Sequence, residues 1–174
     1  MSAASPQVYR VADIGRGYLA MMPHPASLGD PAAAFTALAA RGVRQVVSLL
    51  RDDESERLGL GDEAGLAQAS GIAFSRFPVT DMGAPRSVGG FAQLAGRLYR
   101  DVDAGRSTVI HCRAGVGRSG LLAAAVLMQD GRDARTAFAQ VARRRGMPVP
   151  ETSGQGEWLE ANAAAIRAAG QGAA

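Results

Sequence analysis

The stretch that decides the fold is Val109-Ile110-His111-Cys112-Arg113-Ala114-Gly115-Val116-Gly117-Arg118-Ser119-Gly120, which precedes the apolar run 121–128. The β-branched pair at 109 and 110 is typical of the end of a buried strand. The glycines that follow predict a tight loop, and residues 121–128 predict a buried helix. The only cysteine of the chain therefore lies at a strand end, and Arg118 lies where the helix begins.

This strand, loop and helix arrangement predicts a binding site for an oxyanion. Successive N–H groups of a short loop can form a concave nest, and the first turn of a helix adds unpaired donors and the positive end of its dipole. Glycine lets the backbone approach a ligand closely because it has no Cβ. Arg118 offers a planar fork for two oxygens. We therefore expect a phosphate group to be held by Arg113, Ala114, Gly115, Val116, Gly117 and Arg118.

Cys112 lies in the same electrostatic field. A helix N-terminus and a neighbouring guanidinium both favour the thiolate, which is the nucleophilic form of cysteine. A thiolate beneath a phosphate cradle predicts attack on phosphorus. The alternative interpretation is a lone buried cysteine that packs as a small hydrophobic residue.

The pattern His111-Cys112, five residues, Arg118-Ser119 resembles the signature of the cysteine-dependent protein tyrosine and dual-specificity phosphatases. The resemblance implies that Cys112 forms a phosphocysteine intermediate and that Arg118 binds the phosphate and stabilises the transition state. It also implies that the Ser119 hydroxyl helps the thiolate to leave. We expect His111 to orient the loop and to tune the cysteine through hydrogen bonds.

Two further residues follow from this resemblance. Related phosphatases carry a catalytic aspartate on a loop upstream of the signature, and Asp81 lies in the proline-bracketed loop 78–85. We expect Asp81 to act as general acid and then as general base; the alternative is an aspartate that bonds its own turn. Gln155 resembles the glutamine that positions the hydrolytic water, and its alternative is an exposed side chain near a helix cap. Asp101 and Asp103 fit the acid role less well.

The resemblance covers residues 30–165 and is closest to the small dual-specificity enzymes. The loop 78–85, the signature and Gln155 are similar to those of the phosphatases associated with cyclin-dependent kinases. The implied activity is hydrolysis of phosphate monoesters in phosphorylated proteins or small molecules, on phosphotyrosine and also phosphoserine and phosphothreonine, without a cofactor or metal.

Two alternatives stay open. A phosphoinositide or inositol-phosphate phosphatase is suggested by the basic Arg113 inside the loop, although Val116 stands where such enzymes commonly have a second basic residue. A non-catalytic phosphate-recognition module belongs to a different class. Such modules lose the cysteine, the arginine or the aspartate, and this chain has all three.

Composition narrows the remaining classes. The 174 residues, 47% of them hydrophobic, predict a single phosphatase domain over 1–174 with frayed tails at 1–7 and 169–174. One cysteine and two histidines exclude a disulfide framework and an ordinary zinc site. The absence of lysine excludes Schiff-base chemistry and the lysine-dependent nucleotide loop.

Charge and hydropathy suggest where the protein acts. The net charge of +3 favours anionic substrates but is too small to argue for nucleic acid. The chain starts without the apolar core of a signal peptide and has no run of about 18 apolar residues. We therefore expect a cytoplasmic protein with no membrane insertion, and a monomer.

Hydrophobic patterning predicts an α/β fold with a largely parallel central sheet flanked by helices. The expected strands are 8–11, 18–22, 43–50, 72–77 and 107–111. The expected helices are 31–41, 62–70, 88–103, 121–128, 134–145 and 151–168. We interpret Arg51–Glu54 as a solvated turn and Arg143–Arg145 as a solvated helix end, although either could contact the substrate. His24 is interpreted as a loop histidine without catalytic duty.

Overall fold

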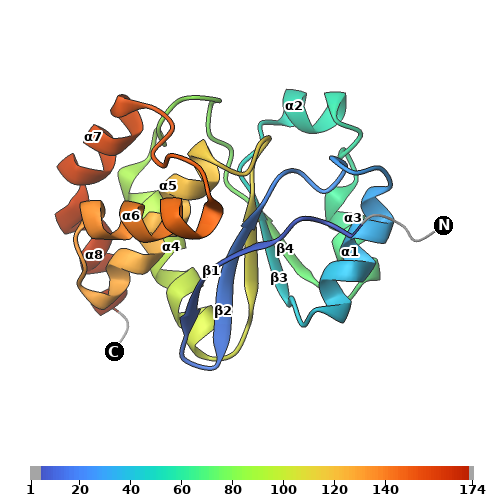
Figure 1. Ribbon diagram of the computed structural model, residues 1–174, viewed down its shortest axis with the longest axis horizontal. Coiled ribbons are helices and arrows are strands. Elements are labelled where there is room, and N and C mark those ends of the chain that lie inside the picture. The colour runs from blue at the N-terminus through green and yellow to red at the C-terminus, as the bar shows by residue number, and fades with distance from the viewer. Residues whose placement is uncertain (1–4, 173–174) are drawn as a thin grey trace.

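The computed structural model describes residues 5–172 and is built on one five-stranded sheet in the order β1-β2-β5-β3-β4 (Figure 1). The strands are β1 (Tyr9–Ile14), β2 (Gly17–Met22), β3 (Gln45–Ser48), β4 (Ala73–Arg76) and β5 (Thr108–His111). Only β1 and β2 pair antiparallel, whereas the other three pairings are parallel. The predicted α/β fold with a largely parallel sheet is confirmed.

The register of the sheet brings three strand ends to one level. His111 of β5 is the partner of Met22 on β2 and of Ser48 on β3. Because these strands are parallel, the segments that follow them leave the sheet at the same edge. That edge is where Cys112 begins its loop.

Helices cover both faces of the sheet, as Figure 1 shows, with α1 and α3 on one side and α4 to α8 on the other. The helices are α1 (Pro31–Ala40), α2 (Asp52–Arg57), α3 (Glu63–Ala69), α4 (Val88–Asp103), α5 (Gly117–Leu127), α6 (Ala134–Arg145), α7 (Ser153–Ala161) and α8 (Ala163–Gln171), with a 3-10 turn η1 (Met128–Asp130). The residues at the start of α1 are typical of a helix N-terminus: the Asp30 carboxylate accepts a hydrogen bond from Ala32 N at 3.0 Å, and Pro31 is the first residue of the helix. Within residues 5–172, no helix has the length and apolar character needed to cross a bilayer.

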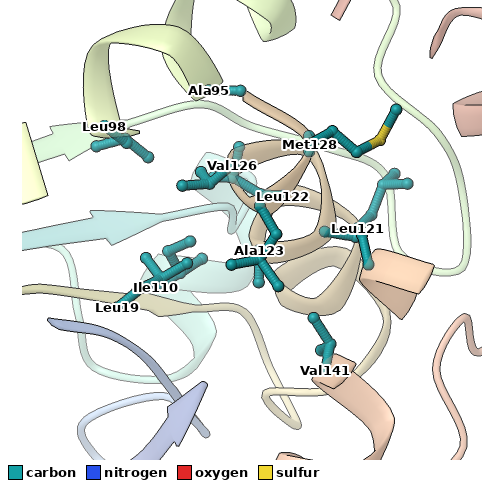
Figure 2. Close-up of a cluster of buried hydrophobic side chains, with 14 of the residues drawn as sticks. Leu19, Ala95, Leu98, Ile110, Leu121, Leu122, Ala123, Val126, Met128 and Val141 are labelled. Atoms are coloured by element: carbon teal, nitrogen blue, oxygen red, sulfur yellow. The ribbon is translucent and has the colours of Figure 1, made fainter. Parts of the chain in front are cut away.

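Successive side chains along each strand point to opposite faces of the sheet, so a hydrophobic core forms on each face. On β5, Val109 packs in the cluster with α1 and α3, while Ile110 packs in the larger cluster with α4, α5 and α6. Every residue of α5 is buried. Figure 2 shows this helix enclosed by side chains from its neighbours, among them Ala95, Leu98, Val141, Leu19 and Ile110. The apolar run after the signature thus belongs to a central helix, α5. Because α5 is buried along its whole length, its packing holds the first turn in place.

Several boundaries of helices and strands that were predicted from the sequence are wrong. The segment 43–50 is a strand only over Gln45–Ser48, although Leu49 and Leu50 remain fully buried. The expected helix 151–168 is divided at Asn162 into α7 and α8. The expected tail after residue 168 is helical as far as Gln171 because α8 packs against α4, and Ile166 is buried there. Of the expected N-terminal tail, residues 5–7 are described: Pro6 is buried, and its carbonyl accepts a hydrogen bond from Arg41. The remaining tail residues, 1–4 and 173–174, lie outside the described part of the chain.

The segment Arg51–Glu54 is not a turn but the start of α2. Asp52, Asp53 and Glu54 occupy the first turn of this helix, where the macrodipole favours negative charge. The Glu54 carboxylate also accepts a hydrogen bond from Arg51 N at 3.1 Å. These local interactions explain why a run of charged residues begins a helix.

Candidate active site

The loop after β5 is held through its carbonyl oxygens. Those of Arg113, Ala114 and Gly115 accept hydrogen bonds from other segments, and the carbonyl of Cys112 lies 3.2 Å from Nδ1 of His111. The backbone N–H groups of residues 113–119, by contrast, have no acceptor among residues 5–172. A loop with its carbonyls engaged and its N–H groups unpaired has the donors that the predicted anion nest requires.

Glycine at 115 is required by both conformation and space. Its φ is +66°, in the left-handed region, and a Cβ there would overlap the backbone C and O of Met22. The loop therefore packs directly on the end of β2. At Gly117 a Cβ would meet the Glu151 side chain, which is flexible and can move, so this glycine is less confined than Gly115.

Cys112 and Arg118, the two residues at the ends of the loop, are both buried, at 3% and 2% exposure. Burial by itself lowers the pKa of Arg118. The hydrogen bond to Glu54 and the electrostatic influence of Cys112, Glu54 and Asp81 outweigh burial and raise that pKa. The guanidinium thus stays charged close to the thiol.

Glu54 is a site residue that the sequence raised only as part of the segment Arg51–Glu54, for which contact with the substrate was the alternative to a solvated turn. Its two carboxylate oxygens accept hydrogen bonds from Nη1 and Nη2 of Arg118 at 2.7 and 2.9 Å, a bidentate pair. Burial raises the pKa of Glu54, but the bonds from Arg118 and Arg51 hold it below its usual value. The interpretation of this segment as merely solvated is therefore wrong at Glu54. No pattern in the sequence pairs residues 54 and 118.

Asp81 lies beside the same guanidinium. Its Oδ1 is 3.2 Å from Nη2 of Arg118, and the neighbouring carbonyl of Val79 accepts from Nη1 at 2.9 Å. The same Oδ1 accepts a hydrogen bond from Met82 N at 3.1 Å. Asp81 thus bonds its own turn and also reaches the site, and half of its side chain is exposed to an incoming group.

Gln155 is buried at 1% exposure rather than exposed near a cap. Its Nε2 donates to the carbonyl of Gly83 at 3.1 Å, which joins α7 to the loop that carries Asp81. Its Oε1 is buried and has no partner among the described residues. An unpaired buried acceptor of this kind is available to a water molecule.

Two more buried polar atoms without a hydrogen-bond partner belong to residues that were predicted to form the site. Nε of Arg118 and Oγ of Ser119 are both buried without a partner among residues 5–172. Native proteins leave few such atoms unpaired, and each requires an explanation. A ligand in the loop supplies one.

His111 is tied to a buried carboxylate that the sequence did not predict. Its Nε2 lies 2.5 Å from Oε1 of Glu63, which opens α3 and is 3% exposed. The other ring nitrogen faces the Cys112 carbonyl, so the imidazole bridges α3 to the loop. His24 joins the same group, because its backbone N–H donates to Arg113 O at 3.2 Å. Burial, followed by the electrostatic influence of His111 and Arg113, lowers the pKa of His24.

The three arginines at the end of α6 differ in burial and in contacts. Arg143 and Arg144 are exposed, as expected, but Arg145 is buried at 8% exposure. Its Nε donates to Gly115 O at 2.7 Å and its Nη2 to Ala114 O at 3.1 Å. Its guanidinium also stacks on the Tyr9 ring at 3.9 Å. The spacing Phe138, Val141, Arg145 places this arginine on the inward face of α6 and could have revealed it.

Solved phosphatase structures share this architecture. Kinase associated phosphatase (KAP), with serine in place of its catalytic cysteine, matches with a TM-score of 0.80 and 19% identity over 99% of this chain and 100% of that one. Tk-PTP in its active form matches with a TM-score of 0.72 and 28% identity over 91% and 97%. PTPMT1 in complex with PI(5)P matches with a TM-score of 0.76 and 20% identity over 92% and 97%. KAP and PTPMT1, at these identities, show the fold.

The family assignment comes from the sequence match. No curated protein matches the chain. A family model described as "Polymorphic toxin system, DSP-PTPase phosphatase" matches residues 21–132, a range that contains Glu54, Asp81 and the whole signature loop. The chain therefore belongs to the DSP-PTPase phosphatases of polymorphic toxin systems.

Proposed function

We propose that the protein hydrolyses phosphate monoesters through a phosphocysteine on Cys112, without a metal ion. The observation that carries this proposal is the ring of unpaired backbone N–H groups at residues 113–119, next to a buried cysteine and a charged, buried arginine. This arrangement is complementary to the equatorial oxygens of a phosphoryl group in transfer. We further propose that dephosphorylation is the chemistry this domain contributes to a polymorphic toxin system, and that it acts in the cytoplasm.

In the first step the thiolate of Cys112 attacks phosphorus, and the S–P bond forms as the bond to the leaving oxygen breaks. Arg118 and the loop N–H groups hold the three remaining oxygens. The leaving oxygen takes a proton from Asp81, whose half-exposed carboxyl group lies beside Arg118. The dephosphorylated alcohol or phenol then departs.

In the second step water attacks the phosphocysteine. Oε1 of Gln155 accepts a hydrogen bond from this water, and the Asp81 carboxylate takes its proton. The S–P bond breaks, the Ser119 hydroxyl donates a hydrogen bond to the departing sulfur, and phosphate is released. The roles given to Gln155 and Ser119 explain why each has a buried, unpaired oxygen.

Phosphotyrosine, together with phosphoserine and phosphothreonine in proteins, is the proposed substrate class. A second candidate is an inositol phosphate, because Arg113 is exposed at the loop and lines a small hollow with Arg57 and Glu54. The fold shared with PTPMT1, whose structure contains PI(5)P, supports testing this candidate.

The decisive test is hydrolysis of a small aryl phosphate with a chelator present. We expect activity in the wild type, none in Cys112→Ser, and a loss of about 10²–10⁴-fold in Asp81→Ala. Asp101→Ala is the matched control, because Asp101 lies near Arg97 and Arg106 at the far end of α4 and should leave the rate unchanged. Activity that survives Cys112→Ser would refute the mechanism. Tight phosphate binding without turnover in the wild type would favour the recognition module instead.

A further inference from the structure

A hollow of about 330 Å³ opens beside the loop that carries Asp81. Two arginines and several apolar side chains form its wall. The lining includes Arg51, Phe77, Val79, Ala84, Arg86 and Ser87. The mechanism described above uses none of these side chains.

The hollow and the phosphate site share a wall. Val79 lines the hollow, and its carbonyl accepts the hydrogen bond from Arg118 at 2.9 Å. Thr80, which also lines it, is the residue before Asp81. On the α2 side, Glu54 binds Arg118 and also accepts the N–H of Arg51. The hollow is therefore lined by the residue that precedes the proposed general acid in the chain, and the Cα atoms of these two residues are about 3.8 Å apart.

The two arginines that line the hollow give it a positive charge, and only one of them is in an ion pair with another described residue. Arg86 is exposed and makes no ion pair or hydrogen bond with residues 5–172. Arg51 lies 3.3 Å from Asp53, which Arg57 also binds, while Asp52 is paired with Arg76 at 2.8 Å. The nearby carboxylates of α2 are thus neutralised by arginines, and Arg86 is left to meet an anion.

The rest of the wall is apolar. Phe77 is half-buried, Val79 is 3% exposed and Ala84 is half-buried. Ser87 caps the 16-residue α4, whose N-terminus adds to the positive potential. An anion at the end of a carbon chain fits both parts of this wall. A glutamate side chain has that form, whereas an inositol ring covered with phosphates has no apolar stem.

We propose that this hollow binds an acidic side chain adjacent to the phosphorylated residue of a peptide substrate, with Arg86 and Arg51 as its cationic partners. The inference rests on the proposed phosphatase function and adds its substrate preference. It predicts that a peptide with glutamate beside phosphotyrosine is a better substrate than the same peptide with alanine there.

The test is a cycle that varies enzyme and substrate together. Phosphotyrosyl peptides carry glutamate, alanine or lysine on the N-terminal or the C-terminal side, and kcat/KM is measured for wild type, Arg86→Gln, Arg51→Gln and Arg86→Glu. We expect the glutamate-to-alanine ratio to fall about 5-fold in each glutamine variant, the range of a single accessible ion pair. Arg86→Glu should reverse the preference toward lysine, which loss of a merely structural role would not do. Arg16→Gln is the matched control, because Arg16 is exposed in the β1–β2 turn at the opposite end of the sheet.

The possible outcomes distinguish a failure of the proposed subsite from a failure of the proposed phosphatase activity. A wild type that hydrolyses small aryl phosphates and both peptides, but with ratios that no arginine variant changes, overturns the subsite alone. Coupling of Arg86 to a second phosphate on an inositol bisphosphate, without coupling to peptides, overturns the peptide assignment. A wild type that hydrolyses no phosphate monoester overturns the proposed function and this inference together.

Discussion

Gly115 shows how much of the site depends on a single residue. The loop turns at its φ of +66°, and the space where a Cβ would lie is filled by the backbone of Met22. Its carbonyl is also the one that Arg145 binds most closely, at 2.7 Å. Any side chain there would push the loop away from the end of β2 and displace the N–H donors of the proposed phosphate site.

Gly115→Ala should therefore lose both stability and activity. We compare it with Gly146→Ala, since Gly146 also has a positive φ, +75°, but has open space around its Cβ position. The control should cost about 1–2 kcal/mol of unfolding free energy from conformation alone. Gly115→Ala should cost about 1–3 kcal/mol more from overlap. Denaturant unfolding and kcat/KM measure both effects, and equal losses in the two variants would contradict this account.

At the scale of elements, the site is assembled by helices that reach the loop from outside. The end of α6 supplies Arg145 to the carbonyls of Ala114 and Gly115, and α3 supplies Glu63 to His111. The start of α2 supplies Glu54 to Arg118. Each of these contacts holds a residue of the proposed phosphate site in place, and none of Arg145, Glu63 and Glu54 is itself expected to react.

Removing Arg145 should release the loop from α6. In Arg145→Met the carbonyls of Ala114 and Gly115 lose both hydrogen bonds, which should cost about 1.5–3 kcal/mol, the range for bonds to a charged group. Arg144→Met is the control, because Arg144 is the exposed neighbour on the same helix. We expect weaker inhibition by inorganic phosphate and a lower kcat/KM only in Arg145→Met. A folded Arg145→Met enzyme with unchanged phosphate affinity would show that α6 does not position the loop.

At the scale of the whole molecule, the fold brings together side chains from distant parts of the chain. Glu54 and Arg118 are 64 residues apart, and Gln155 lies 72 residues from the carbonyl that it binds. The shared level of the β2, β3 and β5 ends makes this possible, because their loops meet at one edge of the sheet. The site therefore depends on global folding.

This dependence predicts how stability varies with pH. The bonds from Arg118 and Arg51 lower the pKa of Glu54 in the folded state below its usual value of 4.5. A carboxyl group with a lowered folded pKa stabilises the protein above that usual value, and this contribution is lost as the pH falls toward the lowered pKa. Glu54→Gln should thus be less stable than wild type at pH 7, by about 1.5–3 kcal/mol. The difference should shrink on acidification below pH 4.5. Denaturant titrations across this range check it, and a difference independent of pH would be inconsistent with a stabilising ion pair.

The sequence by itself determined the class of fold, the family and the residues of the signature. These follow from local patterns: an apolar strand, a glycine loop and an apolar helix adjacent in the chain, whose geometry depends on neighbouring residues. The extent of α4 over Val88–Asp103 was predicted without error for the same reason, since its apolar spacing and its terminal residues are local. The positions of Asp81 and Gln155 followed from resemblance, and their catalytic roles remain predictions.

Only the tertiary structure decided the roles of Glu54, Glu63 and Arg145. In the sequence each is one charged residue among several, and a charged residue is ordinarily solvated. Its role changes only when folding buries it beside a specific partner, here Arg118, His111 or the loop carbonyls. Sheet register and helix packing bring those partners close across 30 to 64 residues, so no local pattern identifies the partners. For Arg145 the helical spacing indicates an inward-facing side chain, but it does not indicate which carbonyls that side chain binds.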